Sequence, residues 1–299
     1  MSFEIAFPEP KPKVTVETPM MQEIMAVTMA NQPTGNMSLW YGNTGIGKTT
    51  TAEYLEMKIN EAFKRDQTNP NAFRAKHYQV GEIPEWTGNE QKQGIMSVYV
   101  AMGVTMSVGE YRFRQAHELA DDVVEMAKRK RDKMFFLDEA GCLSLGAIRG
   151  IVTIRDRSVK IAWPISFIFI GMDDLPKKLN AIPQIQRRVH PWIYFEEYDF
   201  EDTWELLSKL HPHFATLDRG TKEHVAQVKF IHQTFGGYPG LIVPFLSEFD
   251  LTLRASRGQV DERLLRSVHY LMTNPKEKSI ELSKALHKTW PLRTARKRA

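Results

Sequence analysis

The feature that most constrains this chain is an eight-residue stretch, residues 42–49, which fits the pattern G-x-x-x-x-G-K-[ST]. An apolar run, residues 37–41, precedes it, and a helix-forming run, residues 50–57, follows it. In this strand-loop-helix context, glycines let backbone N–H groups wrap around phosphates, and the helix N-terminus adds the positive end of its dipole. The pattern therefore predicts a phosphate-binding loop for a nucleoside triphosphate, and a chance match is remote.

The chemistry of the loop residues predicts their roles. We expect Lys48 to reach the β- and γ-phosphates of ATP and the hydroxyl of Thr49 to bind Mg²⁺. ATP and Mg²⁺ are therefore the predicted cofactors. The residues expected to contact the nucleotide are Gly42, Asn43, Thr44, Gly45, Ile46, Gly47, Lys48, Thr49 and Thr50.

Two adjacent acids, Asp138 and Glu139, follow the short apolar run of residues 134–137. Such a run is typical of a strand buried in a parallel sheet, and ligands bind at the carboxyl ends of strands in open α/β sheets. We expect Asp138 to hold Mg²⁺ through a water molecule and Glu139 to polarise the attacking water. A second acid placed to recruit water favours hydrolysis of ATP over phosphoryl transfer to a metabolite.

The order of elements predicts an α/β fold with a parallel sheet covered by helices. Strands are expected over residues 37–41, 74–80, 134–137 and 165–170. Beyond Tyr194 the sequence is predominantly helical, with helices expected over residues 200–210, 221–234, 241–257 and 261–272. The expected parts are an extended N-terminal arm (1–19), an α/β ATPase domain (20–196), a small helical lid domain (197–275) and a basic C-terminal tail (276–299).

Positive charge is concentrated at the C-terminal end. The formal net charge is +4, yet residues 283–299 contain six Lys or Arg and no acid, so the rest of the chain is net negative. This basic segment is either an arm for nucleic acid or an acidic partner, or a solvated terminus.

The sequence favours the cytoplasm and no membrane partner. The longest mostly apolar run, residues 161–172, is too short to span a bilayer. The first residues lack a basic and apolar leader, and the single Cys142 cannot form an internal disulfide.

A pair of arginines, Arg187 and Arg188, follows the last predicted strand of the sheet. Paired arginines at this point can supply an arginine finger, which reaches the nucleotide of a neighbouring subunit and assists catalysis. They can equally form a solvated basic turn. Both interpretations are open from the residues alone.

Together, the phosphate loop, the acid pair, the arginine pair and the helical C-terminal part resemble the AAA+ superfamily. Within it, the chain is similar to transposition regulators of the MuB, TniB and TnsC type. The resemblance covers about residues 20–257, and the choice of branch rests on size, on the order of elements and on residues 169–175. That stretch resembles the group's apolar-Gly-x-Asp-x-Leu segment.

The resemblance implies an ATP-bound homo-oligomer, either a ring or a helical filament, on double-stranded DNA. Such an oligomer selects target sites and recruits a transposase, with a target-selection protein as a further partner. The resemblance also implies DNA contacts from the segment after the second strand, namely Lys92, Thr105, Arg112 and Arg114. Each of these residues could instead belong to the polar face of an amphipathic helix.

Two positions depart from the AAA+ pattern. Many members place Asn, Thr or Ser at the end of the fourth strand to sense the γ-phosphate, whereas this chain has Met172 followed by Asp173, which is the candidate for that role. Many also carry an arginine after a Gly-x-Pro turn in the lid, where this chain has Gly240. Because glycine has no side chain to contact phosphate, we expect slow hydrolysis.

Two other functions remain open. A helicase loader or replication initiator shares the same core, although no appended helix-turn-helix is evident in the sequence. A signalling scaffold that binds nucleotide tightly and hydrolyses little belongs to a different class of protein. Salt-sensitive DNA binding that requires ATP would separate the transposition regulator from the scaffold.

Overall fold

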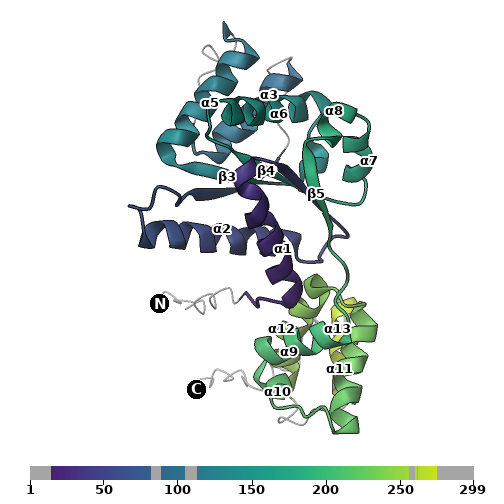
Figure 1. The fold of residues 1–299 in the computed structure, drawn as a ribbon. Helices are drawn as coiled ribbons and strands as arrows, with labels where there is room; N and C mark the ends of the chain where they lie inside the picture. The colour runs from purple at the N-terminus through teal and green to yellow at the C-terminus, as the bar shows by residue number, and fades with distance from the viewer. Residues whose placement is uncertain (1–14, 82–88, 105–112, 256–259, 261, 275–299) are drawn as a thin grey trace, which may run out of the picture. The chain divides into compact units, whose positions relative to one another are not determined.

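The computed structural model describes residues 15–81, 89–104, 113–255, 260 and 262–274 (Figure 1). The chain forms two compact units, one ending at Glu196 and the other starting at Glu197. Most of the predicted N-terminal arm and the predicted basic tail lie outside the described residues, as do Thr105 and Arg112.

The first unit is built on a five-stranded sheet in the order β2-β3-β4-β1-β5. Its strands are β1 (Met37–Tyr41), β2 (Arg74–Gln79), β3 (Asp132–Asp138), β4 (Ser166–Gly171) and β5 (Val189–Tyr194). All neighbouring strands are parallel, so their carboxyl ends meet at one edge of the sheet and their amino ends at the opposite edge. We call these the carboxyl edge and the amino edge.

Strand β5 is the one strand of this sheet that the sequence did not predict. It is an outermost strand of the sheet, next to β1, and it contains Pro191. Proline has no N–H group to donate to a neighbouring strand, so it is tolerated mainly in the outermost strands of a sheet. It also weakens the sequence signal for a strand. Pairing with β1, for example of Leu39 with Trp192, nevertheless makes this segment a strand.

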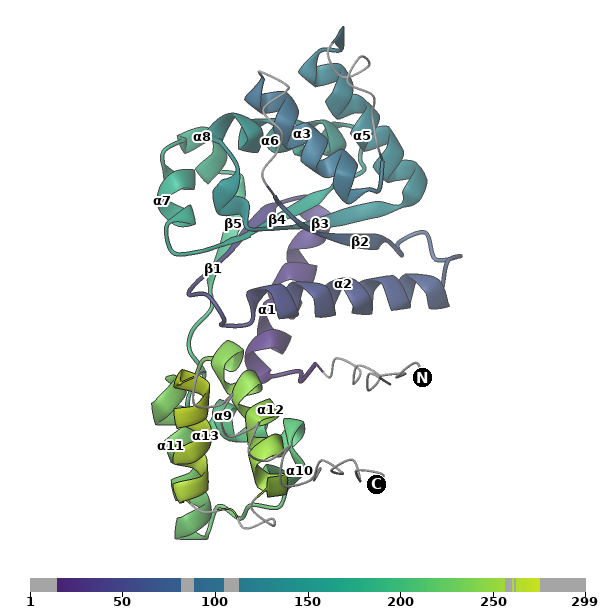
Figure 2. The same cartoon turned by 180° about the vertical axis from the view of Figure 1, so that it is seen from behind.

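Helices cover both faces of the sheet, as Figures 1 and 2 show from opposite sides. One face carries α1 (Pro19–Asn31) and α2 (Lys48–Arg65), and the other carries α3 (Glu90–Ala101), α5 (Ala116–Lys130) and α6 (Leu145–Lys160). Two short helices, α7 (Leu175–Asn180) and α8 (Pro183–Gln186), precede β5. The predicted α/β class and the parallel sheet are therefore confirmed.

The central strands are apolar on both faces because helices cover both. Phe135 and Phe136 are neighbours in β3 that point to opposite faces, and both are fully buried. Phe135 stacks on Phe167 of β4 with ring centroids 5.4 Å apart, whereas Phe136 packs against Trp40 of β1 at 5.5 Å. This packing holds the ends of β1, β3 and β4 in fixed positions.

Two glycines allow α3 and α6 to touch along their backbones. A Cβ atom at Gly94 would lie 1.8 Å from the carbonyl oxygen of Ala147, and one at Gly150 would lie 2.0 Å from that of Gln91. No side chain fits at either distance, so this close packing requires glycine. It attaches α3, in the segment between β2 and β3, firmly to the core.

The second unit is helical. It contains α9 (Phe200–Leu210), α10 (Pro212–Ala215), α11 (Lys222–Phe235), α12 (Pro239–Ala255) and α13 (Glu262–Thr273). The four longer helices coincide with the predicted ones to within a turn, while α10 was not predicted. The buried rings of Phe214, Phe245 and Phe249 pack together in its core. Within the described parts of both units, no helix is long and apolar enough to cross a membrane.

Candidate nucleotide-binding site

The loop between β1 and α2 has a backbone that only glycine accommodates at two points. Gly47, the residue before α2, has a φ of 104°, which residues with side chains rarely adopt. At Gly42, a Cβ atom would lie 2.7 Å from the carbonyl oxygen of Phe195. The glycines thus lead β1 directly into the N-terminus of α2, whose N–H groups and dipole attract anions.

Lys48 is buried and folds back over this loop. Its Nζ atom donates hydrogen bonds to the carbonyl oxygens of Gly42 at 2.7 Å and Asn43 at 2.8 Å. It makes no ion pair with any residue in the described ranges. A buried ammonium group held by neutral carbonyls is well placed to gain a more strongly charged acceptor, such as a phosphate.

Three acids surround Lys48 at the carboxyl edge. Burial lowers the pKa of Lys48 below its usual value, although Asp138, Glu139 and Asp173 each act to raise it. Asp173 reaches this position because β4, which pairs with β1 up to Gly171, ends beside the loop. The sheet therefore gathers the loop lysine, the acid pair and the candidate sensor at one edge.

Asp138, the last residue of β3, is held in place by two hydrogen bonds. The Thr49 hydroxyl donates to its Oδ2 atom at 2.6 Å, and the backbone N–H of Glu139 donates to its Oδ1 atom at 2.9 Å. Burial acts to raise the pKa of Asp138, but the nearby His77 ring, the Thr49 hydroxyl and the Glu139 N–H group outweigh it and hold that pKa below its usual value.

The donor set fits a magnesium ion and a nucleoside triphosphate. Mg²⁺ prefers oxygen ligands and binds through one or two protein groups, together with phosphate oxygens and water. Thr49 and Asp138 present a hydroxyl and an ionised carboxylate in direct contact, next to Lys48. These three residues would hold the metal and the phosphates.

Glu139 differs from its neighbour in both conformation and exposure. Its backbone is left-handed, with φ 57° and ψ 34°, and the chain turns there into the short 3₁₀ helix Ala140–Cys142. For a residue other than glycine this conformation costs roughly 1–3 kcal/mol, and such strain is frequent at functional sites. The turn leaves Glu139 exposed while Asp138 is buried, so the two acids are suited to different roles.

The arginine pair lies at the amino edge, just before β5, and its members differ sharply. Arg188 forms a bidentate ion pair with Asp156 of α6, with its Nε and Nη2 atoms each 3.1 Å from a carboxylate oxygen. Its Nη1 atom also donates to the carbonyl oxygen of Gln184 at 2.7 Å. Arg155 contacts the same Asp156 carboxylate at 3.0 Å. Arg188 is therefore part of a structural network.

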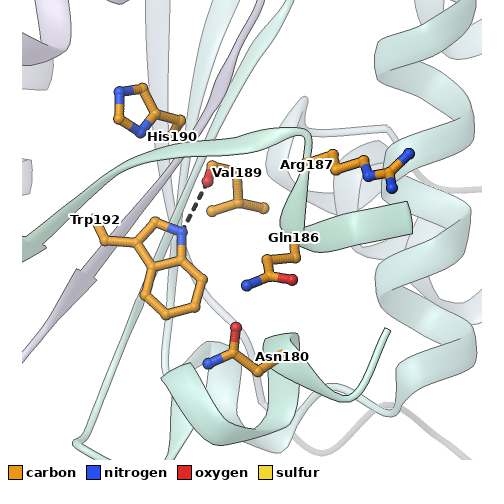
Figure 3. A pocket seen from close by; sticks show the side chains of 6 residues that line it. All are labelled: Asn180, Gln186, Arg187, Val189, His190 and Trp192. Carbon is orange, nitrogen blue, oxygen red and sulfur yellow. Dashed lines mark hydrogen bonds between the residues drawn. The ribbon is translucent and has the colours of Figure 1, made fainter. Parts of the chain in front are cut away.

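Arg187, in contrast, is exposed, and its side chain forms no hydrogen bond or ion pair within the part of the chain that the structure describes. It borders a cavity of about 520 Å³ (Figure 3). In Figure 3 its guanidinium points away from the Trp192 ring, whose Nε1 atom donates to the carbonyl oxygen of Val189 at 2.7 Å. The residues that line the cavity are Asn180, Gln186, Arg187, Val189, His190 and Trp192.

The candidate DNA contacts lie in the segment between β2 and β3. Lys92 is half-buried on α3, and Arg114 precedes α5 and is ion-paired with Asp122. That pair already compensates the charge of Arg114. Thr105 and Arg112 remain predictions outside the described residues.

One residue near the site was not selected from the sequence. His77 of β2 places its Nε2 atom 3.5 Å from Oδ2 of Asp138. Its spacing to other histidines gave no reason to choose it. The signal that could have found it is its place close to the end of β2, because β2 pairs with the strand that carries Asp138.

Known structures share this fold at low sequence identity. The Aeropyrum pernix ORC2 protein, in ADPNP and ADP complexes, matches with 17% identity and a TM-score of 0.58, covering 90% of this chain and 70% of that one. The Aeropyrum pernix ORC1 protein in complex with DNA has 17% identity and a TM-score of 0.55, covering 85% and 64%. Drosophila ORC bound to DNA has 14% identity and a TM-score of 0.54, covering 90% and 68%.

No model of a known protein family matches the sequence, and no curated protein matches it either. At 14–17% identity, the structural likeness concerns the fold. Together with the strand order β2-β3-β4-β1-β5 and the helices on both faces, it establishes that the first unit has the AAA+ fold that these ORC structures share.

Proposed function

We propose that this protein is an ATP-dependent, DNA-binding ATPase that oligomerises on double-stranded DNA. The observation that carries the proposal is the gathering of Lys48, Thr49, Asp138 and Glu139 at one edge of the sheet. These residues supply a cation for phosphates, two oxygen ligands for Mg²⁺ and an exposed carboxylate for water.

Each residue has one task in this mechanism. Lys48 binds the β- and γ-phosphates and exchanges its loop carbonyls for phosphate oxygens. Thr49 and Asp138 hold the metal, which when bound neutralises charge on the phosphates. Glu139 orients a water molecule and accepts its proton. Asp173 contributes to sensing the γ-phosphate.

We assign Arg187 rather than Arg188 as the residue that acts across a subunit boundary. Arg187 lies before β5, at the amino edge, whereas the phosphate loop follows β1 at the carboxyl edge. The five-residue strand β1 alone spans about 17 Å, at roughly 3.3 Å per residue. Arg187 therefore cannot reach the nucleotide of its own chain. A head-to-tail contact with a second copy brings the two edges together and builds either a ring or a filament.

Double-stranded DNA is the proposed ligand of the oligomer. Two of the similar structures, those of the Aeropyrum pernix ORC1 protein and of Drosophila ORC, are complexes with DNA. In this chain, the proposed contacts are Lys92, Thr105, Arg112 and Arg114, and the basic residues 283–299 add attraction that is independent of sequence.

We further propose that the assembly regulates transposition by selecting target sites and recruiting a transposase. This rests on the similarity of residues 169–175 to the transposition regulators. A replication-type helicase loader is the second candidate, favoured by the likeness to the ORC proteins.

Fluorescence anisotropy with a labelled duplex, over a salt series and with ATP, ADP or no nucleotide, tests the DNA proposal. We expect tight binding only with ATP, weakening steeply with salt. Deletion of residues 283–299 should reduce the log–log salt slope by about 0.9 for each phosphate that the tail no longer neutralises and leave the ATP requirement intact. DNA binding that depends on neither ATP nor salt would contradict the proposal and favour a scaffold.

Electron microscopy with ATP and long duplex DNA separates the two DNA functions. A continuous oligomer on DNA of arbitrary sequence, which then retains a purified transposase, supports regulation of transposition. Binding of the purified replicative helicase, without such coating of DNA, would overturn transposition in favour of helicase loading.

A further inference from the structure

His77 lies on β2, the strand at the side of the sheet opposite to β5. The pairing of β2 with β3 sets His77 beside Phe136 and Gln79 beside Asp138. The His77 side chain is only 13% exposed, and its Nε2 atom is 3.5 Å from Oδ2 of Asp138. The imidazole is thus adjacent to the carboxylate proposed to hold Mg²⁺.

The Nε2 atom is buried and has no hydrogen-bond partner within the described ranges. Leaving a buried polar group unpaired is unfavourable, so such atoms usually have a function or a partner nearby. The only acid in ion-pair range of His77 among the described residues is Asp138. A shift of a few tenths of an ångström would turn this approach into a hydrogen bond.

We propose that His77 is a positioning residue for the metal site. Its Nε2–H group faces Oδ2 of Asp138 and, with the Thr49 hydroxyl and the Glu139 N–H group, fixes the orientation of that carboxylate. The inference rests on the proposed Mg²⁺-nucleotide site and specifies how that site obtains its affinity for the metal.

The three donors approach different oxygen atoms of the Asp138 carboxylate. Thr49 and His77 approach Oδ2, whereas the Glu139 N–H group binds Oδ1. Without His77, Oδ2 would rely on the Thr49 hydroxyl alone, a group that the metal also needs. The lowered pKa of Asp138 agrees with this, because His77 is one of the groups that offset the effect of burial.

Two variants separate positioning from packing. His77→Phe keeps an aromatic ring and removes the N–H donor, whereas His77→Gln keeps a donor at comparable reach. The measurement is the Mg²⁺ concentration that gives half-maximal binding of a fluorescent ATP analogue. We expect His77→Phe to raise this concentration 10–100-fold, as loss of outer-shell partners of metal ligands typically does, and His77→Gln to stay within about threefold of the unmodified protein.

Two further readouts show whether the effect is specific to the metal. Binding of the analogue in EDTA and the unfolding temperature without nucleotide should be unchanged in His77→Phe. A loss of metal-free binding or of stability that accounts for the whole effect would overturn the inference and assign a packing role. An unchanged Mg²⁺ curve in His77→Phe would also overturn it.

A measurement on the unmodified protein serves if the phenylalanine variant fails to fold. Nitrogen-15 NMR of the histidine rings should show a proton on Nε2 of His77. A proton on Nδ1 with a bare Nε2 would overturn the inference. If the unmodified protein bound no nucleotide at any Mg²⁺ concentration, the proposed function itself would fail, which differs from an unchanged curve in the variant.

Discussion

The carboxyl and amino edges of the sheet both gather charged side chains, but they pair them differently. At the amino edge, Arg155 and Arg188 share the carboxylate of Asp156, so these charges hold α6 to the start of β5. At the carboxyl edge, the ammonium of Lys48 rests on backbone carbonyls although acids lie nearby. Charges that satisfy one another stabilise the fold, whereas a cation held by neutral groups is free to exchange them for a ligand.

Lys48→Ala tests this comparison with the largest expected effect. ATP affinity should fall at least about 100-fold, because the phosphates lose a charge-assisted partner worth around 3 kcal/mol in a partly buried site. The unfolding temperature without nucleotide should change little, because the lysine contacts only loop carbonyls. Calorimetric titration with ATP and thermal unfolding measure the two quantities. Unchanged affinity would refute the phosphate-loop assignment.

Glu139→Gln should separate binding from chemistry at the same edge. Hydrolysis should fall about 100-fold or more, since the amide cannot accept a proton from water. Binding of Mg²⁺ and ATP should stay within about threefold, because Thr49 and Asp138 remain. A matched control is Glu61→Gln, an exposed acid on α2 that pairs with Arg65. Steady-state phosphate release checks the prediction, and a parental rate in Glu139→Gln would exclude this residue as the water-polarising group.

The adjacent arginines offer a matched pair at the amino edge. Arg187→Ala should lower hydrolysis by the oligomer at least about tenfold, as expected for an arginine that reaches a neighbouring nucleotide, and leave stability unchanged. Arg188→Ala should instead lower the free energy of unfolding by about 1–3 kcal/mol, because Asp156 loses a two-pronged charged partner. Urea unfolding and hydrolysis assays on both variants provide the comparison.

Mixing Arg187→Ala with Lys48→Ala tests whether the arginine acts between subunits. Each variant contributes the intact half of a shared site, so mixed interfaces should recover part of the activity. Recovery in the mixture supports a shared site. If Arg188→Ala carried the hydrolysis defect and Arg187→Ala did not, the assignment of the two residues would be reversed.

Asp132, at the start of β3, gives the smallest predicted effect and a test by pH. It is fully buried, with Arg74 Nε 3.4 Å from its carboxylate, and burial raises its pKa above the usual value despite that arginine. A raised folded-state pKa means that its contribution to stability is full below the unfolded pKa and is lost as pH rises through the folded value. Because asparagine does not ionise, Asp132→Asn removes this loss of stability at higher pH. Urea unfolding between about pH 4 and 7 should show the variant gaining stability relative to the parent as pH rises, and a constant difference would contradict the prediction.

Local patterns predicted much of this molecule. The loop at residues 42–49 and the apolar run before Asp138 depend on backbone freedom and burial over a few consecutive residues, so they can be recognised without the fold. The same holds for the long helices of the second unit, whose ranges were predicted to within a turn. Strand β5 was missed because Pro191 weakens its local pattern, and only pairing with β1 defines it.

The sequence alone determined the α/β class and the identity of the candidate nucleotide residues, since these follow from local chemistry. Tertiary structure decided which charges meet. Arg187 and Arg188 are chemically identical neighbours, and the main difference between them is that Asp156, more than thirty positions earlier, lies against Arg188. His77 likewise gains its place beside Asp138 from the register of two strands far apart in the sequence. Pairings of this kind depend on long-range packing, which no local pattern encodes.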